Sequence, residues 1–208
     1  MSKPLIIKKK IKKFNKSISV GGDKSISIRW VLFASLANGI STAKNLLISH
    51  DVFAAINAIQ KLGIKVILSK NSCKIFGEGI NGYNYKKKII IDAKNSGTLG
   101  RLLLGLLINS PFSIKMIGDK SLSKRDFKRV SDPLSKFGAK FKLFKKKNLP
   151  LSISGSSNLN PIKYLENKGS AQCKSAVILG AMRTEGETLI KAKKSRNHTE
   201  LLCKYLNL

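Results

Sequence analysis

The chain is poor in the residues on which disulfide frameworks and metal centres depend. Its 208 residues include 3 cysteines, 2 histidines and 11 acidic residues. The cysteines, Cys73, Cys173 and Cys203, lie far apart, and an odd number without a Cys-x-x-Cys pair argues against disulfides or a zinc site. Two histidines would need several carboxylates beside them to hold a metal, and carboxylates are scarce. We therefore expect reduced thiols and no metal.

Long apolar runs are also missing. No run approaches the roughly 18 residues that a membrane-spanning helix requires. The apolar centre of the basic first stretch is only residues 5–7, which is too short for a signal peptide. Because 42% of the residues are hydrophobic, the chain can still bury a core of one large or two small domains. We therefore expect a soluble, cytoplasmic protein.

Negative charge is scarce, and 40 basic residues give a net charge of +29. This charge favours either a polyanionic partner or an anionic small molecule, unless it reflects a compositional bias towards Lys, Ile and Asn. The lysines are spread along the whole chain, and only 7% of the residues are aromatic, which leaves few rings to stack on bases. We favour the bias and expect no nucleic-acid partner, with a basic nucleic-acid-binding domain as an alternative.

One segment of the chain is repeated. Residues 49–52 lead into an amphipathic helix that ends before Gly63, and residues 124–127 lead into a similar helix that ends before Gly138, 75 positions later. Glycine after the last apolar turn is a helix C-cap signal, and the apolar run after it predicts a strand. A third copy spans residues 195–206, shifted by 69 positions, and breaks off at Asn207.

A second, apolar helix repeats in phase with the first. Its three copies open at residues 23–25, 95–98 and 170–172. Strand-like runs precede them at residues 17–20, 88–92 and 162–165 and follow them at residues 42–47, 113–117 and 188–192. The predicted unit is strand, buried helix, strand, amphipathic helix, then one or two strands. Three such units imply pseudo-threefold packing with the apolar helices inside.

The starts of these helices are suited to anions. A helix N-terminus offers unpaired N–H groups and partial positive charge, and a pseudo-threefold axis can bring three of them to one surface. The side chains at the starts are cations, small polar groups and one glycine that lets a ligand approach the backbone. These residues are Lys24, Ser25, Arg29, Asn95, Gly97, Ser170, Gln172, Arg125, Ser195 and Arg196.

Five ordered motifs resemble the 5-enolpyruvylshikimate-3-phosphate (EPSP) synthase family. Residues 22–29 are similar to its Gly-x-Lys-Ser-x-Ser-x-Arg opening, and residues 95–101 to its Asn-x-Gly-Thr-x-x-Arg segment. Residues 118–125 are similar to Gly-Asp-x-Ser-Leu-x-x-Arg. Residues 170–176 and 195–200 resemble the Ser-Ala-Gln-x-Lys-Ser-Ala and Arg-Asp-His-Thr-Glu segments of one bacterial branch.

This resemblance implies an inside-out α/β barrel built from βαβαββ repeats, with the third repeat truncated here. It also implies that residues 1–20 belong to a second domain and that residues 21–208 form an incomplete N-terminal substrate-binding domain. Full-length members are monomers about twice as long, and their C-terminal domain supplies the carboxylates for proton transfer. We therefore expect a fragment that holds half of an active site and is inactive alone.

The implied reaction transfers the enolpyruvyl group from phosphoenolpyruvate to the 5-hydroxyl of shikimate 3-phosphate and releases phosphate. It belongs to the shikimate pathway, which leads to chorismate and the aromatic amino acids, and it requires no metal or organic cofactor. Lys24 is the implied catalytic residue, contacting both substrates and stabilising developing charge. The implied shikimate 3-phosphate ligands are Lys24, Ser25, Arg29, Ser170, Ala171 (through its N–H), Gln172, Ser195 and Arg196. The implied phosphoenolpyruvate ligands are Lys24, Asn95, Gly97, Arg125 and Gln172.

The chain departs from the family pattern in a few places. Asp126 follows Arg125 where the family often has proline, which predicts an altered loop or partial neutralisation of Arg125. Asn197 and Gly169 replace aspartate and alanine, with little expected effect. Gly97 matches the glycine on which glyphosate inhibition depends in sensitive members, so we expect a full-length version to be inhibited.

A related family is the other enzymatic alternative. UDP-N-acetylglucosamine enolpyruvyl transferases typically open with Lys-Asn rather than Lys24-Ser25. They also carry a cysteine near the position of Arg125, whereas this chain has none between Cys73 and Cys173. The motifs therefore favour the shikimate enzyme.

Overall fold

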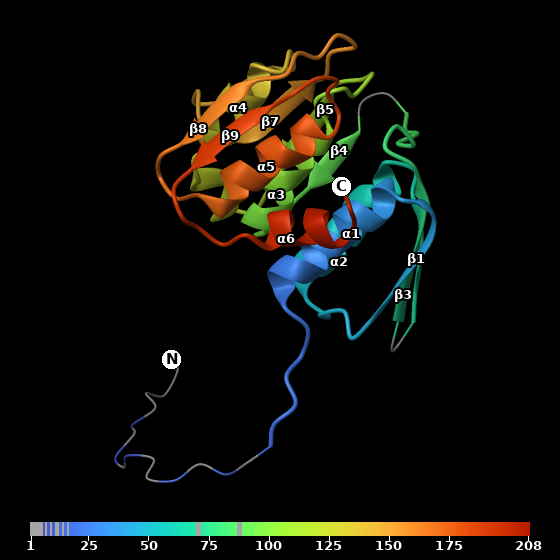
Figure 1. Ribbon diagram of the computed structural model, residues 1–208, viewed down its shortest axis with the longest axis vertical. Coiled ribbons are helices and arrows are strands. Elements are labelled where there is room, and N and C mark those ends of the chain that lie inside the picture. The colour runs from blue at the N-terminus through green and yellow to red at the C-terminus, as the bar shows by residue number, and fades with distance from the viewer. Residues whose placement is uncertain are drawn as a thin grey trace.

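The computed structural model describes residues 17–69, 72–86 and 89–208, together with residues 6, 8, 10, 13 and 15. Helices and strands alternate along these ranges, which shows an α/β fold (Figure 1). The first unit contains α1 (Lys24–Leu36), β1 (Asn38–Lys44), α2 (His50–Lys61), β2 (Lys65–Leu68) and β3 (Ser72–Glu78). The second contains β4 (Ile90–Asp92), α3 (Gly97–Leu106), β5 (Ile114–Ile117), the 3-10 helix η1 (Leu122–Lys124), α4 (Lys128–Ser135), β6 (Lys140–Phe144) and β7 (Asn148–Ser154). The third contains β8 (Lys163–Glu166), α5 (Ala171–Ala181), β9 (Leu189–Ala192) and α6 (His198–Tyr205).

The sheets of the first two units share one topology. The first sheet has the order β1-β3-β2, with β3 antiparallel to both neighbours. In the second sheet, β4-β5-β7-β6, strand β7 is antiparallel to β5 and β6, and β4 adds a parallel edge. In the third unit β8 and β9 pair in parallel, as β4 and β5 do. The closed arrangement of an inside-out barrel stays a prediction.

The ends of the amphipathic helices confirm the repeat that the sequence predicts. Gly63 and Gly138 follow α2 and α4 with φ angles of 93° and 122°, a left-handed conformation that glycine adopts at low cost. Asn207, 69 positions after Gly138, follows α6 with φ of 55°. Asparagine is the usual substitute for glycine at this position.

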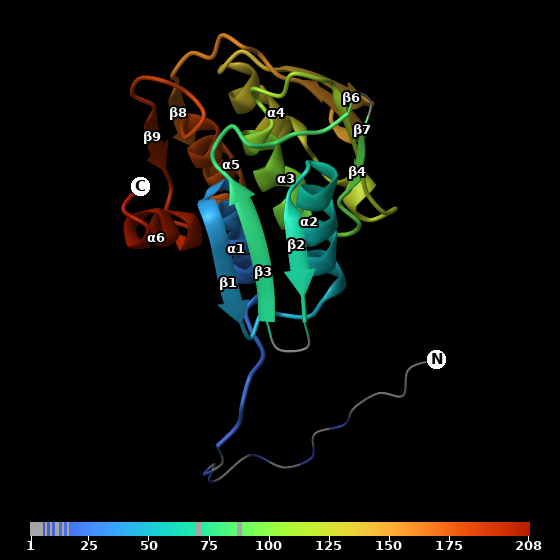
Figure 2. The same ribbon diagram turned by 90° about the vertical axis from the view of Figure 1, so that its right-hand side faces the viewer.

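The three apolar helices form the centre of the core. Helix α3 packs against both α5 and α1, and Figure 1 shows α3 and α5 side by side. Leu102, Leu103 and Leu104 of α3 are completely buried. At Gly105 the two backbones approach so closely that an added Cβ would lie 2.1 Å from the Ala176 carbonyl oxygen. The sheet of β1, β2 and β3 covers α1 and α2 on the outside (Figure 2).

One sequence prediction about the elements is wrong. Residues 17–20 form no strand; their backbone makes no ladder with the described residues, and Ile18 and Val20 are exposed. The second amphipathic helix begins at Lys128, directly after the predicted lead-in of residues 124–127. The Asp126 carboxylate accepts the Lys128 N–H, the first of this helix, at 2.8 Å.

The domain assignment stays a prediction. Residues 1–5, 7, 9, 11, 12, 14 and 16 of the expected segment 1–20 lie outside the described residues, as do residues 87 and 88 at the start of one predicted strand. In the described ranges, no helix is both long and apolar enough to cross a membrane.

Candidate anion-binding site

The starts of α1, α3 and α5 are built in the same way. In each, the residue before the helix accepts a hydrogen bond from the backbone N–H three positions later. The pairs are Ile26 N to Asp23 Oδ1 at 2.7 Å, Leu99 N to Ser96 Oγ at 3.2 Å, and Cys173 N to Ser170 Oγ at 3.2 Å. Such N-caps fix where a helix begins and leave its earliest N–H groups facing outward.

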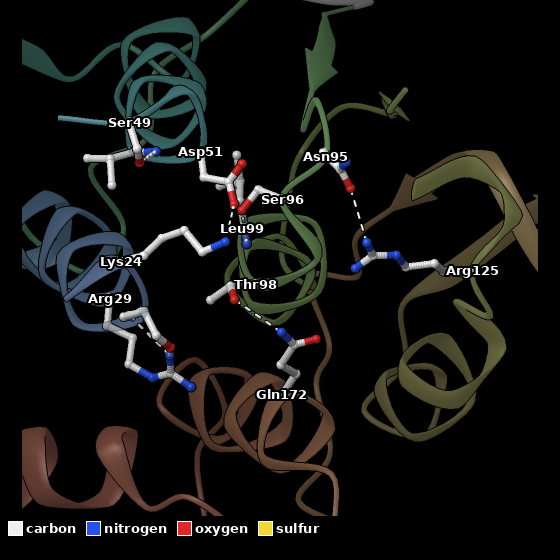
Figure 3. Close-up of polar contacts among 12 residues, drawn as sticks. Lys24, Arg29, Ser49, Asp51, Asn95, Ser96, Thr98, Leu99, Arg125 and Gln172 are labelled. Atoms are coloured by element: carbon white, nitrogen blue, oxygen red, sulfur yellow. Dashed lines mark hydrogen bonds and ion pairs between the residues drawn. The ribbon is translucent and has the colours of Figure 1, made fainter. Parts of the chain in front are cut away.

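These starts surround a cleft of about 300 Å³ (Figure 3). Its walls come from α1, α2, α3, α5 and the loop before α4, so every unit contributes to it. All five residues predicted to contact phosphoenolpyruvate are in its lining. The lining residues are Lys24, Asp51, Asn95, Gly97, Thr98, Arg125 and Gln172.

Lys24 reaches the cleft from the first turn of α1. Its Nζ lies 3.0 Å from Oδ2 of Asp51 on α2. The Lys24 side chain is 55% exposed, whereas Asp51 is 17% exposed. Because the Lys24 ammonium is more than half exposed, water screens its pair with Asp51, and the ammonium remains accessible to an incoming anion. Asp51 was not predicted as a site residue, although it lies at a repeated helix start.

Arg125 approaches the cleft from the opposite side. It lies in the extended stretch between η1 and α4, and its Nη2 donates to Asn95 Oδ1 at 3.1 Å. No ion pair joins Asp126 to Arg125 among the described residues; the Asp126 carboxylate accepts the Lys128 N–H at the start of α4 instead. The Arg125 guanidinium thus keeps donors for a ligand.

Gly97 lies where the guanidinium groups of Arg101 and Arg125 converge, and a side chain at this position would have no room. A Cβ at this position would lie 2.8 Å from Nη1 of Arg101 and 3.0 Å from Nη1 of Arg125. Both distances are shorter than ordinary contacts, so a larger side chain would displace one or both guanidinium groups. The glycine also leaves the first N–H of α3 accessible to a ligand.

Gln172 is held by α3 in a single orientation. Its Oε1 accepts from Arg101 Nη1 at 2.7 Å, and its Nε2 donates to Thr98 Oγ1 at 3.0 Å. Arg101 also lies over the Phe127 ring, 5.0 Å from its centroid, and burial lowers the pKa of its guanidinium. Arg101 and Thr98 were not assigned site roles, although both are in the motif at residues 95–101.

Ser25 and Arg29 lie outside the lining of this cleft. Arg29 is only 3% exposed and joins three helices: it donates to Ser25 Oγ at 2.5 Å, Ser175 Oγ at 3.1 Å and Thr199 Oγ1 at 2.7 Å. Burial lowers the pKa of its guanidinium, and the positive charge of Arg196 lowers it further.

The remaining predicted residues lie at the starts of α5 and α6. Ser170 and Ala171 precede Gln172 directly, whereas Ser195 and Arg196 lie two to three residues before α6. The Ser195 Oγ is buried and has no hydrogen-bond partner among the described residues. In the same part of the chain, no group of three or more His, Cys, Asp or Glu side chains could hold a metal ion.

Comparison with known proteins identifies the family. Residues 8–208 match the family described as EPSP synthase (3-phosphoshikimate 1-carboxyvinyltransferase). A protein of that name from Caldicellulosiruptor bescii is 43% identical over 197 residues, which is 93% of this chain and 45% of the relative. One from Streptococcus equi subsp. equi is 43% identical over 196 residues, with 93% and 46% covered.

A solved structure agrees with these matches. The EPSP synthase of Acinetobacter baumannii superposes with a TM-score of 0.85 at 34% identity, over 90% of this chain and 42% of that protein. The chain thus spans a little under half the length of the relatives it matches. From these matches and the five motifs, the chain belongs to the EPSP synthase family.

Proposed function

We propose that this chain forms the substrate-binding part of a 3-phosphoshikimate 1-carboxyvinyltransferase. The complete enzyme would transfer enolpyruvyl from phosphoenolpyruvate to the 5-hydroxyl of shikimate 3-phosphate and release phosphate, in the cytoplasm. One observation carries the proposal: cations and capped helix starts from three units meet around one cleft. Both substrates are small and carry phosphate and carboxylate, which such a surface binds well.

Each wall of the cleft has a part in this proposal. Lys24 and Arg125 face each other across the start of α3, and the two would bind the phosphate and carboxylate of phosphoenolpyruvate. Ser170, the Ala171 N–H and Gln172 would bind shikimate 3-phosphate at the start of α5. Gln172, which lines the cleft and begins α5, would lie between the two substrates.

The remaining shikimate 3-phosphate contacts would come from the buried Arg29, the half-buried Ser25 and Ser195, and the exposed Arg196. Ser25 and Arg29 would hold the ring and its carboxylate, and Ser195 and Arg196 the phosphate. Arg29 has its Nε and both terminal nitrogens aligned by hydroxyl partners, and Nη1 also donates to the Ser25 carbonyl oxygen, so the one remaining N–H donor has a fixed direction. A pre-oriented guanidinium binds a carboxylate with less loss of side-chain entropy.

Lys24 would act on the reaction by charge. Negative charge that develops on the substrates is stabilised by a nearby ammonium group, most strongly where water is excluded. Proton transfer needs a titratable group that is free to act. Asp51 is the one carboxylate in the lining of the cleft among the described residues, and it is paired with Lys24. We therefore propose that this chain binds and positions substrates, that a second domain transfers the protons, and that the chain alone has no turnover.

Calorimetry and a phosphate-release assay test the proposal together. We expect the purified chain to bind shikimate 3-phosphate, then phosphoenolpyruvate or glyphosate, without releasing phosphate. Lys24→Met should weaken binding of both substrates, whereas Lys61→Met, at the C-terminal end of α2, should not. Failure of the wild-type chain to bind shikimate 3-phosphate would refute the binding role, and phosphate release by this chain would refute the need for a second domain.

A further inference from the structure

Glu166 is a buried carboxylate four residues before Ser170, the N-cap of α5. It ends β8 and is only 4% exposed. Its Oε2 accepts the Ser170 N–H at 2.7 Å, and its Oε1 accepts the Lys168 N–H at 3.2 Å. Oε1 also lies 3.8 Å from Nη2 of Arg129 on α4. A buried carboxylate is costly unless it is bonded in this way, so these contacts hold the loop in one shape.

The hydrogen bonds at the start of α5 show which N–H groups remain for a ligand. The Ser170 N–H is taken by Glu166, the Cys173 N–H by Ser170 Oγ, and the Lys174 N–H by the Ser170 carbonyl oxygen at 3.1 Å. In the described structure, the N–H groups of Ala171 and Gln172 have no protein acceptor. Two adjacent free N–H groups at a capped helix start suit one phosphate group.

We infer that Glu166 is the positioning residue of the phosphate subsite for shikimate 3-phosphate. By accepting the Ser170 N–H, it sets the position of Ser170 and directs the next two N–H groups towards the ligand. This inference rests on the proposed function of the chain and adds a residue that would touch no substrate. The contact with Arg129 on α4 means that the second unit also helps to hold Glu166 in place.

The negative charge of Glu166 opposes phosphate binding. The direction in which the affinity changes therefore distinguishes the loss of this charge from the loss of the positioning hydrogen bonds. A carboxylate close to a phosphate repels it, and removal of the negative charge alone would tighten binding. Loss of the positioning hydrogen bonds would weaken binding instead. Glu166→Gln removes the charge and leaves one acceptor oxygen for two N–H groups. Glu166→Asp keeps the charge but shortens the side chain.

The experiment measures binding of shikimate 3-phosphate and of shikimate, which lacks the phosphate, to the whole chain and its variants. We expect both Glu166 variants to bind shikimate 3-phosphate about tenfold more weakly and shikimate within about twofold of the wild type. Glu187→Gln, an exposed change of equal charge, is the matched control and should bind both ligands normally.

Three outcomes would overturn the inference. Unchanged or tighter binding of shikimate 3-phosphate by the variants would show that Glu166 does not position the subsite. An equal loss for both ligands would show only a general structural role. No binding by the wild-type chain would refute the proposed function as well, so the two failures are distinguishable. If Glu166→Gln does not fold by circular dichroism, Glu166→Asp, which keeps the negative charge, decides between these results.

Discussion

The substitution Gly97→Ala tests the geometry of the cleft with a single added carbon. The new Cβ would lie 2.8 Å from Arg101 Nη1, 3.0 Å from Arg125 Nη1 and 3.7 Å from Gln172 Oε1. The first two atoms are the ends of flexible side chains, so they can move away, whereas the helix backbone stays in place. The structure therefore predicts a change in the site rather than in the fold.

The expected changes in stability and in affinity can therefore be worked out separately. Alanine at a helical position gains at most about 1 kcal/mol over glycine, and this gain offsets the cost of moving two side chains. We expect the free energy of unfolding to change by less than about 1 kcal/mol. Displacement of the Arg125 guanidinium from Asn95 costs at least one charge-assisted hydrogen bond, which predicts about tenfold weaker binding of phosphoenolpyruvate. Shikimate 3-phosphate should lose less than about threefold.

The assays are urea denaturation, and calorimetry with phosphoenolpyruvate in the presence of saturating shikimate 3-phosphate. Gly100→Ala on the same helix is the control, because its Cβ would face the Phe127 ring at 3.3 Å and not a guanidinium nitrogen. The reasoning is refuted if Gly97→Ala binds phosphoenolpyruvate as the wild type does. It is also refuted if the variant loses stability but retains affinity.

Three further predictions concern the hydrogen bonds of Arg29, pH and inhibition. Thr199→Val removes the Arg29 Nε acceptor and should lower the free energy of unfolding by about 1–3 kcal/mol in urea, whereas the exposed Thr42→Val should change it little. Burial raises the pKa of Asp92, but the hydrogen bonds and charge of Lys94 outweigh it, and the pKa lies below its ordinary 3.8. The stability that wild type gains over Asp92→Asn should be complete above about pH 5 and fall as the pH drops through the folded pKa; a constant difference from pH 6 to 2 contradicts this. A full-length enzyme that contains this chain should be inhibited by glyphosate, and unchanged turnover at concentrations that saturate sensitive enzymes would exclude it.

Local signals in the sequence were sufficient to predict most of the elements. Asp23, Ser96 and Ser170 are helix caps as their positions suggested, because a short polar side chain satisfies an N–H three residues later in any context. Gly63 and Gly138 end helices because only a left-handed residue closes them in this way. These features depend on neighbours in the chain and can therefore be read from it.

The features that the sequence did not predict depend on contacts between groups that are distant in the chain. The Lys24–Asp51 pair and the Arg29–Thr199 bond join different helices, the latter across 170 positions. The sequence placed these groups at helix starts, but which of them touch is decided by how α1, α2, α5 and α6 pack.

Backbone N–H chemical shifts of the labelled chain, followed by NMR during titration, test the central claim most directly. Shikimate 3-phosphate should shift the amides at the starts of α1 and α5, and added phosphoenolpyruvate should shift Gly97 and Thr98 at the start of α3. Inorganic phosphate at equal charge serves as the control for nonspecific attraction. Shifts spread over exposed lysines such as Lys140 and Lys142, with the three helix starts unchanged, would contradict a built anion site and favour a general polyanion surface.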